Sequence, residues 1–416
     1  MTLAHPPAQY CLTKSCLPFR YKLMTHETTG KDRDDLPNTS LPEIAWLFLK
    51  LGSIGFGGPA ANTALMEQEV VTKRRWLTHE HFLDLLAAAN LIPGANIVEM
   101  AAHVGYVRAG WRGLVVAGAA LILPAFLISL TLSWLYVRFG ALPQGEALLY
   151  GIGPAVLAVV WIACYRLGRA ALHDRLTVAV ALASLVAALA GVNAIVVLLA
   201  AGAAGILVYE APHRLRSFFA LALLGQSFPL AAAPLAGWID ERLVQLGLFF
   251  LKVGALLFGS GMVLFAFIQE DVVEGYGWLT QQQLVDAIAV GQMTPGPVLS
   301  SATFIGYLVA GAPGALVATF AVFLPSFLIT AFIGPWIPRL RRSTVLSAFL
   351  RSVNAAVVAL ILAVSVSLLR TAIVDVWTVI VLAAALAAML RFRVETLWLV
   401  GGGAAFGLLH FLITSA

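Results

Sequence analysis

The chain has 416 residues, of which 60% are apolar and only 11% are charged. Soluble globular domains contain about 25% charged residues, so this composition excludes a water-soluble surface and predicts a protein embedded in a lipid bilayer. A formal net charge of +5 would suit nucleic acid, but the Lys and Arg residues lie in short clusters between apolar runs, where they orient helices in a membrane. We therefore expect no nucleic-acid partner.

The amino-terminal residues 1–42 are polar and carry charges of both signs. They lack the apolar stretch of a signal peptide, which predicts a retained cytoplasmic tail. Cys11 and Cys16 lie in this tail with only His5 as a further ligand nearby, so we expect neither a metal site nor a disulfide framework.

Apolar runs long enough to span a bilayer, roughly 17 to 25 residues each, recur along the rest of the chain. Examples are Leu114 to Val137, Ala147 to Cys164 and Ala315 to Ile337. Only helices and closed barrels satisfy every backbone polar group in lipid. The sequence therefore predicts an all-α polytopic membrane protein.

Residues 43–210, the first repeat, contain two helices that glycine and proline interrupt. A helix that starts near Glu43 meets Phe56-Gly57-Gly58-Pro59, where the glycines have low helix propensity and the proline lacks a backbone donor. A second helix, capped by Thr78, runs to Ile92 and breaks at Pro93-Gly94-Ala95-Asn96 before it resumes. Both breaks fall within apolar sequence.

The same pattern returns about two hundred residues later. The matching segments, each with its counterpart, are Phe48-Leu49-Lys50-Leu51-Gly52 with Phe250-Leu251-Lys252-Val253-Gly254, Trp76-Leu77-Thr78 with Trp278-Leu279-Thr280, Pro93-Gly94 with Pro295-Gly296 and, after a one-residue slip, Pro124-Ala125-Phe126-Leu127-Ile128 with Pro325-Ser326-Phe327-Leu328-Ile329. The second repeat, residues 243–416, breaks at Gly259-Ser260-Gly261 and at Thr294-Pro295-Gly296-Pro297. A match over so long a span predicts two homologous halves.

Charged loops indicate how the two halves lie, because cytoplasmic loops carry an excess of Lys and Arg. Lys73-Arg74-Arg75 corresponds to the uncharged Gly275-Tyr276-Gly277, whereas Arg339, Arg341 and Arg342 correspond to a loop with only Arg138 and Glu146. This alternation predicts inverted topology about a pseudo-twofold axis in the membrane plane. Inversion needs one extra span in the linker 211–242, which the apolar segment 217–238 can supply. The amino terminus is then cytoplasmic and the carboxyl terminus external.

The broken or re-entrant helices are the candidate binding site for an anion. Half-helix starts expose unpaired N–H groups that favour negative charge, and two breaks occur at matching places in each half. The alternative is that the glycines only let helices approach closely. The candidate substrate-binding residues are Lys50, Phe56, Gly57, Gly58, Asn62, Pro93, Gly94, Asn96, Lys252, Gly259, Ser260, Gln292, Thr294, Pro295, Gly296, Pro297 and Ser300.

Two kinds of ionisable residue fall within the apolar helices, where charge is costly. Lys50 and Lys252 occupy equivalent positions, and a basic pair would suit a doubly charged substrate, although each lysine could instead snorkel to the interface. Glu99 and His103 lie one helical turn apart, so their side chains can meet and could relay protons. A structural hydrogen bond is the alternative for this pair.

Motifs for metals and nucleotides are not convincing in context. His79-Glu80-His81 resembles a metal cluster, but it follows the capping Thr78 and becomes Gln281-Gln282-Gln283 in the second repeat. No Walker A sequence is present, and the glycine-rich stretch at 52–58 follows a helix instead of a strand. We expect no cofactor, no metal and no enzymatic activity, since no paired carboxylates and no nucleophile with a base recur in both halves.

The motifs F-L-K-L-G-x-x-x-F-G-G-P at 48–59, V-x-x-R-R-W-L ending at Leu77 and Q-x-T-P-G-P at 292–297 resemble the chromate ion transporter family, in its long two-domain form. The resemblance covers nearly the whole chain after the tail. One departure is Pro93-Gly94-Ala95, where the family usually has P-G-P. Ala95 regains an N–H that proline would lack, so this break is expected to bind differently from Pro295-Gly296-Pro297.

The resemblance implies a secondary transporter that exports chromate from the bacterial cytoplasm across the inner (plasma) membrane, confers chromate resistance and uses the proton motive force. Sulfate, a tetrahedral dianion of similar size, is implied as a competitor or alternative substrate. The rival functions are a carrier for another oxyanion and a gated anion channel, with a membrane enzyme a more remote alternative. The oligomeric state is open, a homodimer being one arrangement.

Overall fold

The computed structural model describes residues 39–415, apart from residues 57, 91–92, 141, 210–239, 334–342 and 393. Among the described residues all regular structure is helical, and five helices are long and apolar enough to cross a membrane. The predicted helical membrane protein is therefore confirmed. The tail to residue 38, most of the linker with its predicted span, Gly57 and the arginines at 339, 341 and 342 lie outside the described residues.

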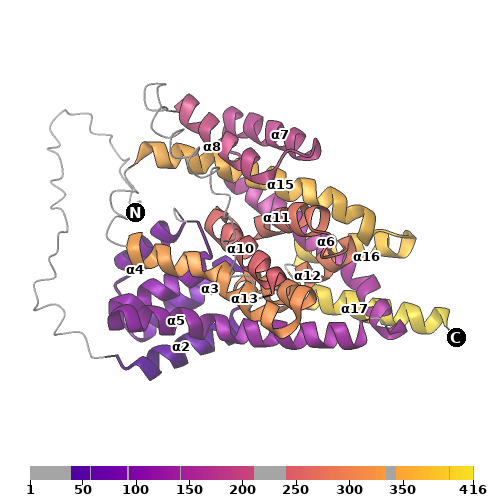
Figure 1. The fold of residues 1–416 in the computed structure, drawn as a ribbon, viewed down its shortest axis with the longest axis horizontal. Coiled ribbons are helices and arrows are strands. Elements are labelled where there is room, and N and C mark those ends of the chain that lie inside the picture. The colour runs from indigo at the N-terminus through magenta and orange to yellow at the C-terminus, as the bar shows by residue number, and fades with distance from the viewer. Residues whose placement is uncertain are drawn as a thin grey trace, which may run out of the picture. The chain divides into compact units, whose positions relative to one another are not determined.

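The helices of the first half are α2 (Leu41–Ile54), α3 (Pro59–Glu67), the π-helix η1 (Gln68–Lys73), α4 (His79–Ala89), α5 (Asn96–Phe139), α6 (Pro143–Ala171), α7 (Arg175–Leu189) and α8 (Ala194–Tyr209). Those of the second half are α10 (Glu241–Leu256), η3 (Gly261–Val263), α11 (Leu264–Phe267), the π-helix η4 (Ile268–Gly275), α12 (Gln281–Met293), η5 (Val298–Ser300), α13 (Ser301–Ile333), α15 (Thr344–Ala372), α16 (Val376–Ala387), η7 (Ala388–Phe392) and α17 (Thr396–Thr414). Figure 1 labels the main helices.

The helix α2 folds back on α3 and η1 as a hairpin. Glu43, at the start of α2, accepts a 2.7 Å hydrogen bond from Arg74, just beyond η1, and Lys50 lies 3.0 Å from Glu69 in an ion pair. These two contacts join residues in antiparallel order, so the bend lies at the break between Ile54 and Pro59. In the second half Lys252 pairs with Asp271 in the same way, between α10 and η4.

The helix α5 also reverses direction. Gly110 has φ of 59° and ψ of −146°, a conformation open essentially only to glycine. A methyl group built on Gly105 would lie 2.2 Å from the carbonyl oxygen of Gly113, although eight residues span about 12 Å in a straight helix. The segments 96–109 and 111–139 therefore pack against each other. The helix α13 repeats this turn at Gly311, with φ of 63° and ψ of −154°.

The first segment of α5 returns toward the start of α4, so these two form a second hairpin. The guanidinium of Arg108, near the end of that segment, lies 5.6 Å from the centre of the Trp76 ring, just before α4. At the opposite end, Asn96 donates a 2.7 Å hydrogen bond to Asn90. The bend of this hairpin therefore lies at residues 90–95, which contain the Pro93-Gly94 break.

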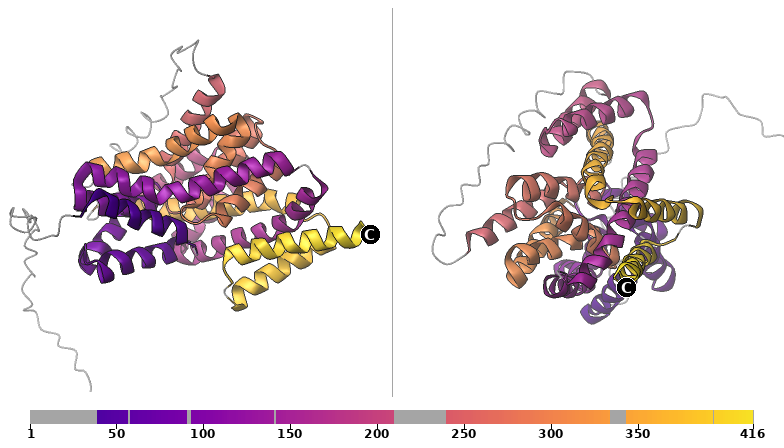
Figure 2. Two further views of the ribbon diagram at one scale, coloured as in Figure 1. Left: turned by 90° about the horizontal axis from the view of Figure 1, so that it is seen from below. Right: turned by 90° about the vertical axis from the view of Figure 1, so that its right-hand side faces the viewer.

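The long second segments of α5 and α13 lie side by side in antiparallel order. Trp111, at the start of one segment, makes an edge contact of 6.0 Å with Phe332, near the end of the other. Further along, a methyl group on Gly118 would lie 2.4 Å from the Phe327 ring. Both helices can be followed in Figures 1 and 2.

Other helices also pack across the two halves. The helix α6 packs against α17, and α8 packs against α15. The first contact is backbone to backbone, since a methyl group on Gly151 would lie 1.9 Å from the carbonyl oxygen of Gly403. In the second, Gly205 lies against Ser352. Small residues thus permit close helix approach. This was the alternative role considered for the glycines of the breaks, but these glycines, Gly151, Gly205 and Gly403, lie outside the breaks.

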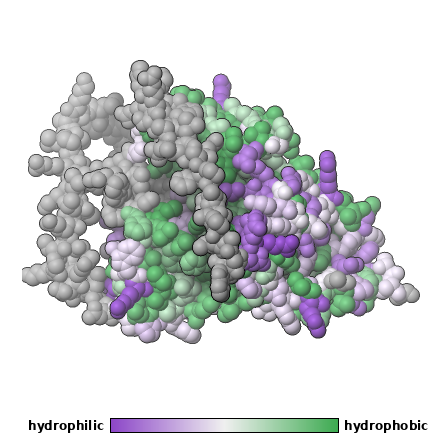
Figure 3. Space-filling model, viewed as in Figure 1, coloured by the Kyte–Doolittle hydropathy of each residue, from purple (hydrophilic) through white to green (hydrophobic). Residues whose placement is uncertain are grey.

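Large apolar side chains on the outer faces of these helices are exposed, as expected for contact with lipid. Examples are Leu127 at 51%, Val186 at 68% and Phe320 at 69% exposure. Figure 3 shows apolar residues over wide areas of one face. Such a surface would be unfavourable in water.

Candidate functional site

The four bends meet through hydrogen bonds between the halves. The backbone N–H of Gly94 donates to the carbonyl oxygen of Leu257 over 2.7 Å, and the N–H of Gly296 donates to that of Gly55 over 2.9 Å. In the repeat register Gly94 corresponds to Gly296, and Gly55 corresponds to Leu257. The two bonds are therefore counterparts, and each joins the Pro-Gly break of one half to the first break of the other.

The repeated Pro-x-Phe-Leu-Ile motifs of α5 and α13 supply the other wall of these junctions. A methyl group on Gly296 would lie 3.6 Å from the Cβ of Ala125, and one on Gly94 would lie 2.3 Å from the Oγ of Ser326, the counterpart of Ala125. Ser326 Oγ also accepts a 3.0 Å hydrogen bond from the N–H of Ala95. Each Pro-Gly break thus lies between two elements of the opposite half.

The junction at Gly94 contains the buried carboxyl group of Glu99. Its side chain is 0% exposed, and the hydroxyl of Ser326 is the neighbouring polar group, on the same side of Gly94. One oxygen lies close to Gly94, since a methyl group there would come within 2.2 Å of it. His103, one turn further along α5, is 5% exposed, and its Nε2 has no partner in the described part of the chain. A buried carboxylate is costly, which favours a proton or a ligand at this junction.

The junction at Gly296 has hydroxyl groups instead. Ser300 occupies the position that corresponds to Glu99, and its hydroxyl lies 2.7 Å from that of Thr294. Both side chains are buried, at 2% and 5% exposure. A pair of neutral hydroxyls can turn its donors toward an oxyanion, whereas a carboxylate in the same place would repel one.

Asn62 of α3 faces the same junction. It is 7% exposed, and its Oδ1 has no hydrogen-bond partner among the described residues. Together with Gly296 it lines a small cavity of about 10 Å³, which has room for about one water molecule. The cavity is too small for a tetrahedral dianion, so the bends must separate before one can bind here.

The two lysines lie along the hairpins and not at the bends. Glu69 receives Lys50 at 3.0 Å and Lys73 at 2.9 Å, and Lys252 pairs with Asp271. The lysine side chains are 43% and 39% exposed. These ion pairs are counterparts in the two halves and account for the charges without a substrate. Anion binding by Lys50 and Lys252 stays a prediction.

The other predicted residues take local roles around the bends. Asn96 bonds Asn90, Gln292 bonds the sulfur of Met262 at 3.6 Å, and Ser260 accepts a 3.2 Å hydrogen bond from the N–H of Met262. Gly58, Gly94, Gly259 and Gly296 all have positive φ. Pro295 and Pro297 are buried, Phe56 and Pro93 are partly buried, and Gly57 is not described.

Sequence reasoning missed Ser326 and the partner carbonyls at Gly55 and Leu257. The motif that contains Ser326 was visible as a repeat, and the change from Ala125 to Ser326 within it was the available signal. The backbone partners left no signal, because any residue presents the same carbonyl group.

A helical membrane protein whose two related halves contribute matching broken helices to a shared junction has the architecture of a transporter. Residues 42–206 and 244–408 each match the model of the chromate transporter family, so the chain belongs to that family. A "Chromate transport protein" of Cupriavidus metallidurans is 35% identical over 90% of this chain and 94% of its own length. A "Probable chromate transport protein" of Synechococcus elongatus is 35% identical over 84% of this chain and 91% of the relative. No solved structure matches the chain.

Proposed function

We propose that this protein is a secondary transporter that exports chromate from the cytoplasm across the plasma membrane, driven by the proton motive force, and so confers chromate resistance. The observation that carries the proposal is the neutral junction at Gly296, in a chain that belongs to the chromate transporter family. Backbone N–H groups and hydroxyls suit a tetrahedral oxyanion, because they are donors that carry no competing negative charge.

The two junctions have different roles in this proposal. The oxyanion binds at Gly296, where Thr294, Ser300 and Asn62 lie close by. The proton binds at Glu99, whose counterpart is Ser300. Each of the two hydrogen bonds joins one half of the protein to the other, Gly94 to Leu257 in one junction and Gly296 to Gly55 in the other. A movement of one half against the other therefore changes the surroundings of both junctions. This arrangement couples the oxyanion to the proton.

Inverted topology of the halves is part of the proposal. Its support is the antiparallel order of α5 and α13, together with contacts between loops that the positive-inside rule assigns to one side. Asp174 lies by Arg351 and Tyr209 on the predicted cytoplasmic side. Asp375 accepts a hydrogen bond from Tyr150 on the predicted external side. No such contact among the described residues joins loops assigned to opposite sides.

The electrical potential alone favours outward movement of an anion, by about 2.3 kcal/mol per charge per 100 mV and about twice that for a dianion. Proton antiport adds a second gradient and uses the buried Glu99. Sulfate is the second candidate substrate, because hydroxyl and N–H donors bind any tetrahedral dianion of similar size.

Flux in proteoliposomes tests the proposal. Chromate, sulfate and molybdate are loaded in parallel, and uptake is followed with and without an imposed pH gradient. We expect saturable chromate counterflow that a proton gradient accelerates. Rapid electrodiffusion without saturation would instead indicate an anion channel, and saturable sulfate flux without chromate flux would indicate a sulfate carrier.

A further inference from the structure

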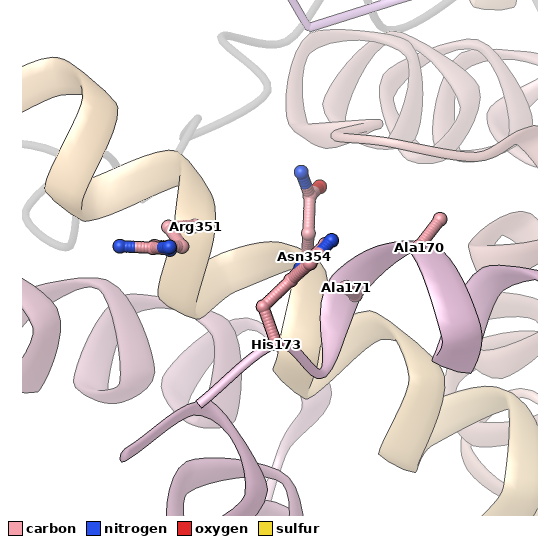
Figure 4. Close-up of a pocket in the computed structure, with 5 residues that line it drawn as sticks. All are labelled: Ala170, Ala171, His173, Arg351 and Asn354. Carbon is pink, nitrogen blue, oxygen red and sulfur yellow. The ribbon is translucent and has the colours of Figure 1, made fainter. Parts of the chain in front are cut away.

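A second cavity lies between the end of α6 and the start of α15. Its volume is about 200 Å³, and it is lined by Ala170, Ala171, His173, Arg351 and Asn354. Figure 4 shows Arg351 and Asn354 on α15 and the other three residues at the end of α6. Three of the five side chains carry nitrogen donors.

The charge of Arg351 is only partly compensated. Its guanidinium lies 3.8 Å from Asp174, too far for a hydrogen bond, and its side chain remains 47% exposed. Asp174 is engaged elsewhere, since it accepts hydrogen bonds from the hydroxyl of Tyr209 and from the N–H of Thr177. These bonds, that of Tyr209 first, lower the pKa of Asp174 to about 2, so the carboxylate is ionised beside the cavity.

Asn354 joins this cavity to the first break of the second half. A methyl group built on Gly259, within that break, would lie 2.2 Å from Asn354 Oδ1, and Gly259 has φ of 74°. The Oδ1 atom is buried and has no hydrogen-bond partner in the described residues. Asn354 therefore lies between the cavity and the break.

At the positions that correspond to the three polar lining residues, the described residues of the opposite half are uncharged, although His410 stacks on one of them, Tyr150, at 5.1 Å. In the repeat register Arg351 corresponds to Tyr150, Asn354 to Gly153 and His173 to Val374, whereas Asp174 corresponds to Asp375 and Thr177 to Thr378. The helix-capping pairs Asp174–Thr177 and Asp375–Thr378 keep the same hydrogen bonds. The helix-capping pair is thus shared by the two halves. The residues that could bind an anion, Arg351, Asn354 and His173, differ between them.

We propose that this cavity is an access site for the tetrahedral oxyanion, in which Arg351 and His173 attract the dianion and Asn354 passes it to the Gly259 break. The inference rests on the proposed function. It places the access site on the face that bears residues 172–175, which is the cytoplasmic face in the proposed topology. Because the permanent cation of Arg351 corresponds to the neutral Tyr150 in the other half, the arrangement favours uptake of substrate from that one face.

Transport kinetics test the role of Arg351. Chromate uptake into inverted vesicles is measured for the parent, Arg351→Gln, Arg351→Lys and the matched control Arg370→Gln, which removes the same charge from the other end of α15. For Arg351→Gln we expect KM to rise about three- to tenfold at low salt with an unchanged maximal rate, and the difference to shrink as salt is raised. Arg351→Lys should recover part of the affinity, and Arg370→Gln should match the parent.

Asp174→Asn should change the KM for chromate in the direction opposite to Arg351→Gln. Asparagine keeps the oxygen that caps α7 but removes the negative charge next to Arg351, so KM should fall. Damage to folding would not lower KM, so this variant separates electrostatics from misfolding. A parental KM in Arg351→Gln, or an equal rise in Arg370→Gln, would overturn the inference.

A binding measurement separates the cavity from transport itself. In a variant with Cys11, Cys16 and Cys164 replaced, Ala170→Cys, at the exposed edge of the same cavity, is alkylated by a maleimide in detergent, with molybdate or sulfate as the probe because neither oxidises thiols. We expect saturable protection by either dianion and none by chloride at matched ionic strength. Protection in a protein that moves no chromate would leave the cavity intact as an oxyanion site and refute only the proposed function. Absence of protection would refute the site.

Discussion

The difference between Glu99 and Ser300 separates the two junctions at the level of single residues. The positions correspond in the repeat, and both side chains are buried, at 0% and 2% exposure. One can carry a negative charge and the other cannot. In the proposed function one half therefore holds a proton and the other an oxyanion at corresponding positions.

Replacement of Glu99 by Gln should remove the dependence of transport on the pH gradient. The carboxyl group is the buried titratable group at the junction, and glutamine keeps its shape without titrating. We expect chromate flux in proteoliposomes to persist under a membrane potential but to lose its acceleration by an imposed proton gradient. His103→Gln should give a smaller loss. Unchanged pH profiles in both variants would make the pair structural.

The hydroxyl pair of Thr294 and Ser300, at the Gly296 junction, should determine the affinity for chromate. Thr294→Val and Ser300→Ala each remove one donor to the bound oxyanion, and a hydrogen bond to a charged group contributes about 1.5 to 3 kcal/mol, or about ten- to a hundredfold in affinity. We expect a rise of that size in KM for chromate.

Thr303→Val is the matched control for the hydroxyl variants. Thr303 and Thr319 form a hydroxyl pair of the same length, 2.7 Å, on α13, but they belong to the two segments of the helix and not to a bend. This variant should keep the parental KM. If all three variants raise KM alike, the Gly296 junction is not the binding site.

At the level of elements, the sequence predicted the broken helices and their places but not their direction. The breaks near Gly58 and Pro93 were visible because glycine and proline interrupt apolar runs. The reversal at Gly110 was not predicted, although Arg108 and Arg112 flank it, because a single glycine there is equally typical of close helix packing. Whether a glycine reverses the chain or only lets helices pack closely depends on its φ angle, which the sequence does not show.

The two reversals at Gly110 and Gly311 should be essential for stability. Alanine in this conformation costs about 1 to 3 kcal/mol, so Gly110→Ala and Gly311→Ala should each lower the thermal unfolding temperature in detergent. Gly401→Ala and Gly402→Ala are controls, since an added Cβ there would meet no atom within 4 Å and alanine favours a helix interior by about 1 kcal/mol. These should leave the midpoint unchanged or raise it. Equal effects at both pairs of sites would contradict the hairpin geometry.

At the level of the whole molecule, the repeat register predicted which residues correspond, but not which residues meet: the sequence suggested that the two Pro-Gly breaks meet each other, whereas each contacts the first break of the other half. It related Gly94 to Gly296 and Pro124 to Pro325, and these regions do form matching contacts. It did not reveal that the lysines at 50 and 252 would be neutralised by Glu69 and Asp271. Those carboxylates lie 19 residues further along the chain, beyond helical spacing, so only the folded hairpin brings them to the lysines.

The orientation of the two halves can be tested at two positions with the same local structure. Arg75 and Gly277 correspond in the repeat, are exposed, and have φ of 53° and 62°. Each is replaced by Cys in a background without Cys11, Cys16 and Cys164. Because the turns match, intrinsic thiol reactivity should match as well, and only the side of the membrane should differ.

In intact cells we expect a membrane-impermeant maleimide to label Gly277→Cys and not Arg75→Cys, and in inverted vesicles the reverse. Detergent should expose both thiols equally, which serves as the control for reactivity. Labelling of both positions from one side would place both hairpin bases on the same face of the membrane. The halves would then be parallel repeats, the antiparallel order of α5 and α13 would need another explanation, and export through alternating exposure of the two junctions would lose its structural basis.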